Sequence, residues 1–426
     1  MTLMGNQNKL FHWSWCIRGI VLGAFVGPVI TFLTNLVIFA TDLRTAYPFL
    51  LLTIPFVALL QQYIRCQGGT MVENSAALII DSINNSSTYA KSCNDSQSFL
   101  DDRGLPPTIL GPLLLLDTFL THVSGGSGGK EGAGVMLGTS IAGMTARAES
   151  KIFHTNYSIK LREAYLMCGA GAAFSALFSA PLAGCMFGLL FANPRINRNE
   201  TFLPCFTAAI TAYITSKALH IHHLPVAAPI SIPFTSVLLV KIIIAAVCIG
   251  LFGRFFCFIT DITRDFYQNI CKNKMRATFF AGCTLLLVTG IFYLIVGEPI
   301  YNGLSTPLIK EAGLGETSYY AALFKLILTT LTVAACMTGG EIVPLLVIGA
   351  TLGATLAPLF GFPPSTMACF GAVGILSSGS KMPVVCFLLG LELFGTTDLV
   401  YLFAVTVISF SVSGNRRIFQ SQIAPV

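Results

Sequence analysis

The sequence predicts an all-α integral membrane protein made of two inverted-topology repeats of tilted and broken transmembrane helices. Three observations support this fold class: the composition, several apolar runs of membrane-spanning length, and a glycine-rich motif that occurs once in each half. Of the 426 residues, 54% are hydrophobic and only 10% are charged. The mean hydropathy of +0.75 lies far outside the usage of soluble domains.

Three apolar runs are long enough to cross a bilayer as helices, which takes about 20 residues each. They cover 17–40, 237–259 and 279–296. Other apolar pieces are interrupted by Gly and Pro. Broken helices are tolerated at membrane depth only where protein or a water-filled cavity satisfies the freed backbone groups. The sequence therefore predicts a lined site inside the membrane-spanning part.

The two halves carry the same pair of motifs in the same order. GGKEGAGVMLGTSIAG (128–143) precedes SAPLAGCMFGLLF (179–191), and GGEIVPLLVIGATLG (339–353) precedes SKMPVVCFLLGLELF (380–394). Many transporters consist of two inverted repeats with the site at their interface. A paired and ordered match of this kind predicts such an arrangement.

The predicted division of the chain follows from this repetition. We expect an N-terminal membrane repeat at 1–225, which includes a polar loop at 84–107, and a C-terminal membrane repeat at 226–426. The loop is rich in Ser, Asn and Asp and is closed by a Pro pair, which is typical of an extramembranous segment. We expect no soluble regulatory domain.

A helix that begins directly after a glycine run predicts an anion site. Its first N–H groups are unpaired, and its positive dipole end points at the preceding loop. Gly128, Gly129 and Gly132 would let an ion approach the main chain closely, and the Gly-Gly pair of the second half would do so from the other side. Glu131 would compete with that ion for the same place and could leave when protonated. Glu131 is therefore the predicted gate and a possible proton carrier.

These motifs resemble those of a known family. GGKEG before an apolar helix resembles the gating-glutamate motif of the CLC chloride channel and transporter family, in which Arg usually stands in place of Lys130. SAPLAGCMFGLLF resembles the helix that follows it, and YNGLSTPLI (301–309) resembles the element that opens the second half. GGEIVPLLVIGATLG, GLELFG and SGNRRIFQSQ are similar to the fluoride-transporting branch. The resemblance covers roughly the whole chain.

The resemblance implies halide transport, of chloride or fluoride or both, with possible coupling to protons as an anion/H⁺ antiporter. It implies a homodimer with one ion pathway in each subunit. The alternatives are a passive voltage- or pH-gated chloride channel and, more remotely, a non-transporting membrane scaffold. The expected partners are chloride or fluoride ions, protons and the lipid bilayer, with no nucleic acid, no cofactor and no metal. We expect a multi-pass protein of the plasma (cell inner) membrane.

The resemblance also implies the site residues, by motif position. Glu131 is the gate. The anion pathway is then lined by Ser75, Ala76, Gly128, Gly129, Gly132, Glu341, Ile342, Val343 and Phe419.

The sequence departs from the family pattern at several of these positions. The inner glutamate of the chloride/proton exchangers is replaced by Leu189 and Leu190, so that proton route is absent. Ser75 or Ala76, Val343 and Phe419 stand where the fluoride branch has more polar groups. Fluoride is strongly hydrated and should suffer more than chloride from lost donors. The lining therefore leaves open which halide is carried and whether the protein is a channel or an exchanger.

A structural role is the alternative for the acidic residues within the apolar segments. A charge within a membrane segment costs about 2.5–3.5 kcal/mol on insertion scales, more than a helix-end acid contributes, so a functional role is favoured for Glu131. For Glu341 the sequence leaves two roles open, a place in the pathway and the anchoring of a loop. For Glu392 a structural hydrogen-bonding role is favoured over proton transfer. Asp117 and His122 are expected to form a satisfied interhelical pair rather than a proton relay.

The glycine-lysine pair at 129–130 also invites comparison with a phosphate-binding loop. That loop needs Gly where Ser124 stands and Ser or Thr where Glu131 stands. We therefore expect neither a nucleotide hydrolase nor any other enzyme.

Overall fold

The structure is a computed structural model that describes residues 2–67, 80, 83, 106, 108–154, 159–192, 196–271, 273–395 and 398–418, with side chains for all of these except 2–13, 67, 159 and 160. Within this part of the chain it has 15 α-helices and no β-strand. The predicted all-α membrane fold is confirmed. The repeat boundary at residue 225 stays a prediction. The polar loop predicted at 84–107 lies outside the described residues, apart from Pro106.

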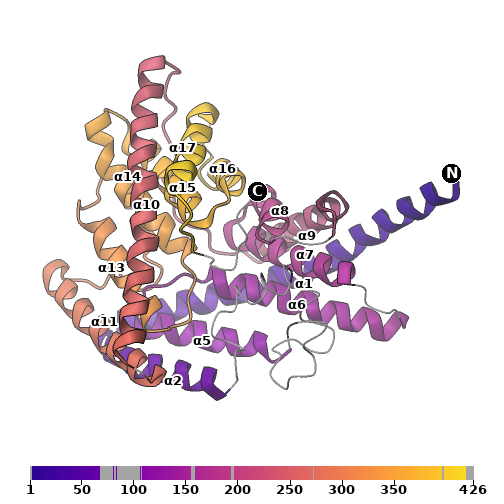
Figure 1. Ribbon diagram of the computed structural model, residues 1–426, viewed down its shortest axis with the longest axis horizontal. Coiled ribbons are helices and arrows are strands. Elements are labelled where there is room, and N and C mark those ends of the chain that lie inside the picture. The colour runs from indigo at the N-terminus through magenta and orange to yellow at the C-terminus, as the bar shows by residue number, and fades with distance from the viewer. Residues whose placement is uncertain are drawn as a thin grey trace.

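The elements fall into two sets along the chain. The first set is α1 (Thr2–Ala46), the 3₁₀-helix η1 (Pro48–Thr53), α2 (Ile54–Gln67), α5 (Leu110–Ser124), α6 (Glu131–Phe153), α7 (Ile159–Phe178), α8 (Pro181–Leu190) and α9 (Arg198–Ala218). The second set is α10 (Ser236–Ile270), α11 (Lys274–Val296), α12 (Pro307–Leu314), α13 (Ala321–Ala334), α14 (Ile342–Phe360), α15 (Pro364–Ser380), α16 (Pro383–Phe394) and α17 (Leu399–Val412). Figure 1 shows most of the second set at the upper left, beside and above the first set.

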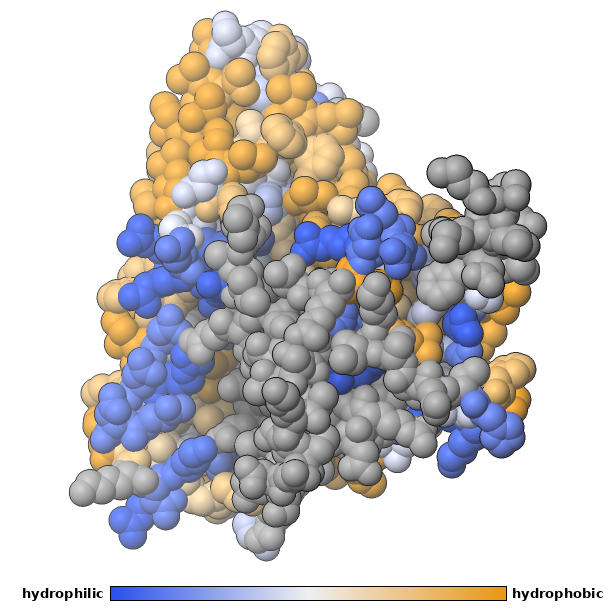
Figure 2. All heavy atoms as spheres, turned by 45° about the vertical axis from the view of Figure 1, so that its right-hand side comes forward, coloured by the Kyte–Doolittle hydropathy of each residue, from blue (hydrophilic) through white to orange (hydrophobic). Residues whose placement is uncertain are grey.

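Five helical segments are long and apolar enough to cross a membrane: Ser14–Ala46, Pro48–Cys66, Ser236–Ile270, Lys274–Val296 and Ile342–Phe360. The runs predicted at 17–40, 237–259 and 279–296 lie within three of these. Large apolar side chains remain exposed on the outside, such as Phe25, Leu294 and Phe403. Figure 2 shows extensive hydrophobic surface in the upper part of the face that it views. A surface of this kind suits contact with lipid.

Close helix crossings explain why the glycines repeat between the halves. Gly138 lies seven residues after the start of α6, and Gly349 lies seven residues after the start of α14. A β-carbon at Gly138 would overlap the carbonyl oxygen of Gly169 on α7, and one at Gly349 would overlap that of Gly371 on α15. Small residues at such crossings let membrane helices approach closely. The two halves therefore repeat the same crossing as well as the same motif.

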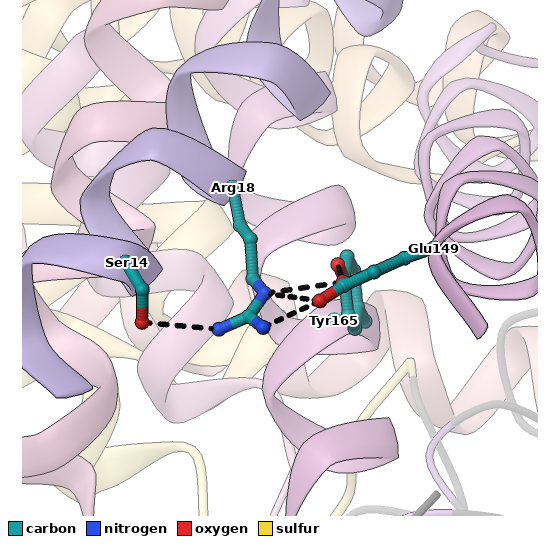
Figure 3. Close-up of polar contacts among 4 residues, drawn as sticks. All are labelled: Ser14, Arg18, Glu149 and Tyr165. Atoms are coloured by element: carbon teal, nitrogen blue, oxygen red, sulfur yellow. Dashed lines mark hydrogen bonds and ion pairs between the residues drawn. The ribbon is translucent and has the colours of Figure 1, made fainter. Parts of the chain in front are cut away.

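A polar cluster joins three helices of the first half (Figure 3). The Nε of Arg18 on α1 donates to both carboxylate oxygens of Glu149 on α6, at 2.8 and 3.1 Å. Arg18 also donates to Ser14 Oγ at 3.2 Å, and the Tyr165 hydroxyl of α7 donates to Glu149. The Arg18 guanidinium carbon lies 4.9 Å from the ring centroid of Trp15. These contacts fix the far end of α6 relative to α1 and α7.

We expect Arg18→Met to lower the free energy of unfolding by about 1.5–3 kcal/mol, the typical contribution of a hydrogen bond to a charged group. Glu149→Gln should also cost stability, because a neutral amide replaces the charged acceptor of Arg18. The double variant should lose less than the sum of the two, since the residues act as one unit. Thermal unfolding of the purified protein in detergent measures all three. Strictly additive losses would contradict the proposed contact.

Candidate functional site

The first glycine loop turns the chain from α5 into α6. Gly125 ends α5 with a φ of 99°, a left-handed conformation that favours glycine. The N–H groups of Gly125 and Gly126 both donate to the carbonyl of Thr121, at 3.2 and 2.8 Å. The loop then runs through Gly128 and Gly129 to the first residue of α6. In the second half, a loop of similar length leads from α13 to α14 in the same way.

The two glycine loops meet backbone to backbone. The Gly129 N–H donates to the Gly340 carbonyl and the Gly340 N–H donates to the Gly129 carbonyl, both at 2.6 Å. A β-carbon at Gly128 would lie 3.2 Å from the Cα of Gly339. Larger residues would push the loops apart. The glycines are therefore required by the close contact between the two repeats.

Glu131 lies at this junction and is completely buried, with 0% of its surface exposed. Its Oε2 accepts a hydrogen bond from the Val343 N–H at 3.3 Å. Val343 is the second residue of α14, so its N–H is one of the groups that a helix start leaves unpaired. The other carboxylate oxygen, Oε1, has no hydrogen-bond partner among the described residues. A carboxylate of the first half thus fills an anion-binding position at a helix start of the second half.

The structure brings together most of the predicted site residues that it describes. Gly128, Gly129, Ile342 and Val343 are buried at the junction, and Gly132 is half-buried there. A β-carbon on Gly132 would lie 3.5 Å from the Cα of Gly340. Ser75, Ala76 and Phe419 lie outside the described residues, so their predicted places in the pathway stay predictions.

Glu341 is the residue directly before α14 and is half-buried. Its carboxylate makes no hydrogen bond or ion pair within the described ranges, and Asp261 and Arg264 of α10 are its charged neighbours. Glu341 and Glu131 thus lie near the same helix start. A role as a loop anchor receives no support from these contacts.

Two buried cations were missed in the sequence. Lys325 on α13 is 0% exposed, and its Nζ donates to the Gly303 carbonyl at 2.6 Å and to Ser305 Oγ at 2.9 Å. Arg44 on α1 donates to the His122 carbonyl at 2.6 Å. Both side chains therefore hold backbone next to the first glycine loop. The available signal was a single basic residue inside an apolar run, which marks a functional or supporting position in a membrane segment.

Lys130 is also buried, with 6% of its surface exposed. Its Nζ donates to Thr34 Oγ1 of α1 at 3.0 Å. The basic residue beside Glu131 thus fixes the start of α6 against α1.

Glu392 on α16 accepts hydrogen bonds from the N–H groups of Leu182 and Ala183, both at 2.8 Å. These groups belong to the start of α8, whose first N–H donors have no partner within the helix. The contact agrees with the structural hydrogen-bonding role favoured from the sequence. The residues in the place of the exchangers' inner glutamate are apolar, and Leu189 is 4% exposed.

The expectation for Asp117 and His122 is wrong. The carboxylate of Asp117 contacts Thr338 Oγ1 at 3.4 Å, and His122 Nδ1 lies 2.8 Å from the Thr118 carbonyl of its own helix. Asp117 Oδ1 and His122 Nε2 both have no partner within the described ranges. The two residues point to different neighbours because they lie on adjacent stripes of α5, so they are neither paired nor satisfied.

Comparison with known families shows to which family the chain belongs. Residues 96–414 match the family described as voltage gated chloride channel. The chain belongs to this family. The prediction of CLC membership from the glycine motifs is thereby confirmed. The family consists of channels and transporters rather than enzymes.

Several CLC proteins are similar over most of the chain. The chloride/fluoride channel protein of Pseudomonas syringae pv. tomato is 27% identical over 388 residues, which is 90% of this chain and 80% of that protein. The H(+)/Cl(-) exchange transporter ClcA of Klebsiella pneumoniae is 26% identical over 300 residues, which is 66% of this chain and 62% of that protein.

Two solved structures carry the same fold. The crystal structure of a CLC-type fluoride/proton antiporter superimposes with a TM-score of 0.85 at 26% identity, covering 97% of this chain and 98% of that one. A slow cyanobacterial Cl⁻/H⁺ antiporter gives a TM-score of 0.70 at 18% identity over 94% of each chain. At 18% identity, the likeness to the cyanobacterial antiporter concerns the fold alone. The likeness to the fluoride/proton antiporter agrees with the resemblance to the fluoride branch.

Proposed function

We propose that this chain exchanges a halide for protons across a membrane, with Glu131 as both the gate and the proton carrier. The observation that carries the proposal is the position of the Glu131 carboxylate on the Val343 N–H at the start of α14. That N–H is a donor that a free halide would need. The related CLC proteins named as a fluoride/proton antiporter and as an H(+)/Cl(-) exchange transporter support coupling to protons.

The exchange follows from competition for one position. While Glu131 is ionised, its carboxylate occupies the start of α14 and keeps the halide out. Protonation removes the charge that the helix start attracts, so the side chain leaves and a halide can enter. Release of the halide and of the proton restores the closed arrangement. Each halide passage is thereby tied to protonation of the gate.

The proposed pathway uses main-chain donors more than polar side chains. Gly128, Gly129, Gly132, Ile342 and Val343 supply close-approaching backbone on the two sides of the junction, and we place Glu341, Ser75, Ala76 and Phe419 along the same route. The apolar side chain of Val343 leaves its N–H donor in place. Fluoride transport is therefore compatible with Val343, although the fluoride branch has a more polar residue at this position. Chloride remains the second candidate ion.

We further place the protein in the plasma membrane as a homodimer, without enzymatic activity. The dimer is supported by the surface around Glu392. Its partly buried carboxylate contacts the start of α8, and α8, α16 and α17 each carry an exposed apolar side chain, namely Leu182, Val384 and Phe403. A carboxylate facing lipid is costly, and a second copy would cover it.

The test is flux from reconstituted liposomes loaded with fluoride or chloride, with external pH followed at the same time. We expect halide efflux accompanied by proton movement in the opposite direction, faster at lower pH because protonation opens the gate. Halide efflux without proton movement would favour the passive channel. Absence of flux of either halide would favour the non-transporting scaffold.

A further inference from the structure

The helix before the gate, α5, carries a polar side that is fully buried. Asp117, Thr118, Thr121, His122 and Ser124 are each 0% exposed. Residues three or four apart are neighbours on a helix surface, so these five side chains form two adjacent stripes over the last part of α5. We call this set the α5 stripe. It ends where the first glycine loop begins.

The α5 stripe is packed against polar groups of two other segments. Gln61 of α2 donates to the Asp117 carbonyl at 2.7 Å and to Thr121 Oγ1 at 2.9 Å. The Thr338 N–H, two residues before Gly340, donates to Gln61 Oε1 at 3.1 Å. The stripe is therefore a polar layer inside the protein rather than a solvated surface.

Several buried atoms on the α5 stripe, next to Gln61 on α2 and at Glu131 have no hydrogen-bond partner in the part of the chain that the structure describes. They are Gln62 Oε1, Asp117 Oδ1, Thr118 Oγ1, His122 Nε2 and, at the gate, Glu131 Oε1. Leaving such a group unsatisfied costs about 1–3 kcal/mol. Buried polar groups of this kind are usually bound to internal water, which makes about three hydrogen bonds. Three such atoms on the α5 stripe, with one on α2 and one at Glu131, point to a row of internal waters.

Polar groups of α2 and of the first glycine loop flank the α5 stripe at its two ends. At one end, Gln62 Nε2 lies 3.6 Å from the Sγ of Cys66, an exposed residue in the last turn of α2. At the other end, the His122 ring lies beside the backbone of Gly128. Gly128 precedes Glu131 by three residues. A row of waters along the α5 stripe would therefore connect the exposed end of α2 with Glu131.

We infer that the α5 stripe holds internal waters that carry protons between the exposed end of α2 and Glu131, with Asp117 as the proton-storing group. The inference rests on the proposed halide/proton exchange. It supplies a route that the chain otherwise lacks, since Leu189 and Leu190 replace the inner glutamate of the exchangers. Of the carboxylates that the structure describes, Asp117 is the fully buried one whose layer leads to the gate loop.

The proton balance of the route is simple. The Asp117 carboxylate takes a proton from a hydronium ion, which leaves a carboxylic acid and a water molecule. The acid then returns the proton through the waters of the stripe to Glu131 Oε1, and the Asp117 carboxylate is restored. Glu131 becomes neutral and opens the gate. No other reactant is needed.

The charged neighbours divide the roles between Asp117 and His122. Arg65 of α2 faces Asp117, whereas Arg44 of α1 and Lys325 of α13 lie near His122. A carboxylate beside a single cation can gain and lose a proton. The His122 Nδ1–H donates to the Thr118 carbonyl, a tautomer assigned from that partner. Nε2 is then a free acceptor that can orient a water, so we treat His122 as a positioning residue.

The experiment measures protons moved per halide for the full-length protein in liposomes. Asp117→Asn keeps the side-chain shape and removes the titratable group. His122→Asn keeps an amide donor at the position of Nδ1 but has no atom at Nε2, whereas His122→Gln can place a polar atom near Nε2. The control is Asp398→Asn, because Asp398 accepts from Ser231 and Ile232 and lies outside the α5 stripe.

We expect halide flux to persist and the proton-to-halide ratio to fall by about tenfold or more in Asp117→Asn and His122→Asn. That is less than the roughly 10²–10⁴-fold effect of a positioned proton-transfer group, because water can partly replace the lost atom. His122→Gln should have a higher proton-to-halide ratio than His122→Asn, and Asp398→Asn should keep the wild-type ratio. If Asp117→Asn does not fold, the comparison between His122→Asn and His122→Gln tests the inference.

A wild-type ratio in both Asp117→Asn and His122→Asn would overturn the inference, as would an equal loss in Asp398→Asn. In either case coupled transport by the wild type would still support the proposed function. A wild type that moves halide without protons would instead overturn the proposed coupling, and this inference with it.

Discussion

Proton movement falls to the level of protein-free liposomes when Glu131 is replaced by Gln, while halide still crosses. This is the expected result because glutamine keeps the shape of the side chain but cannot take up or release a proton. Its neutral amide also lacks the charge that holds the carboxylate at the start of α14. The halide can then enter without waiting for protonation. Simultaneous halide and pH recordings measure both flows.

The matched control uses the same substitution on the same helix. Glu149 lies near the far end of α6 and is bonded to Arg18 and Tyr165 rather than to the junction. Glu149→Gln should therefore lower stability but keep the proton-to-halide ratio of the wild type. Unchanged coupling in Glu131→Gln would exclude Glu131 as the proton carrier, whatever Glu149→Gln does.

Gly129→Ala should produce the second large effect, a halide leak that is no longer coupled to protons. A β-carbon at Gly129 would overlap the Glu131 carboxylate, so the side chain must leave the Val343 N–H. A hydrogen bond to a charged group contributes about 1.5–3 kcal/mol. Its loss lowers the ratio of closed to open gates by about 10- to 150-fold. Efflux at neutral pH, where the wild-type gate is mostly closed, measures this ratio.

Gly111→Ala is the control for the effect of an added methyl group. A β-carbon at Gly111 of α5 would lie 3.6 Å from a side-chain carbon of Leu137, which is ordinary contact. Coupling should be retained in this variant. A tightly coupled Gly129→Ala variant would mean that Glu131 does not need its observed position in order to close the pathway.

The glycine loops and the place of Glu131 beside them could be predicted because their signals are local. A Gly-Gly pair before an apolar helix specifies an open helix start, and the repetition of that pattern in both halves predicts that the two starts converge. The hydrogen bond from Val343 to Glu131 spans 212 residues of sequence. The sequence predicts that the two helix starts converge, but it does not identify Val343 as the donor. No local pattern identifies a donor so far along the chain.

The supporting contacts could not be predicted for the same physical reason. Glu392 accepts from Leu182 and Ala183 across about 210 residues, so the sequence could indicate a structural role but not the partner. Lys325 and Arg44 bind backbone carbonyls, which every residue possesses and which therefore carry no sequence signal. The error at Asp117 and His122 came from treating proximity along one helix as pairing.

The central claim is that the Glu131 carboxylate and the transported halide compete for the same donors at the start of α14. Halide affinity measured by titration calorimetry at two pH values, for the wild type and Glu131→Gln, tests it most directly. The account predicts tighter halide binding by the wild type at the lower pH, because protonation vacates the position. It predicts tight, pH-independent binding by Glu131→Gln. Equal halide affinity in both proteins at both pH values would contradict the competition.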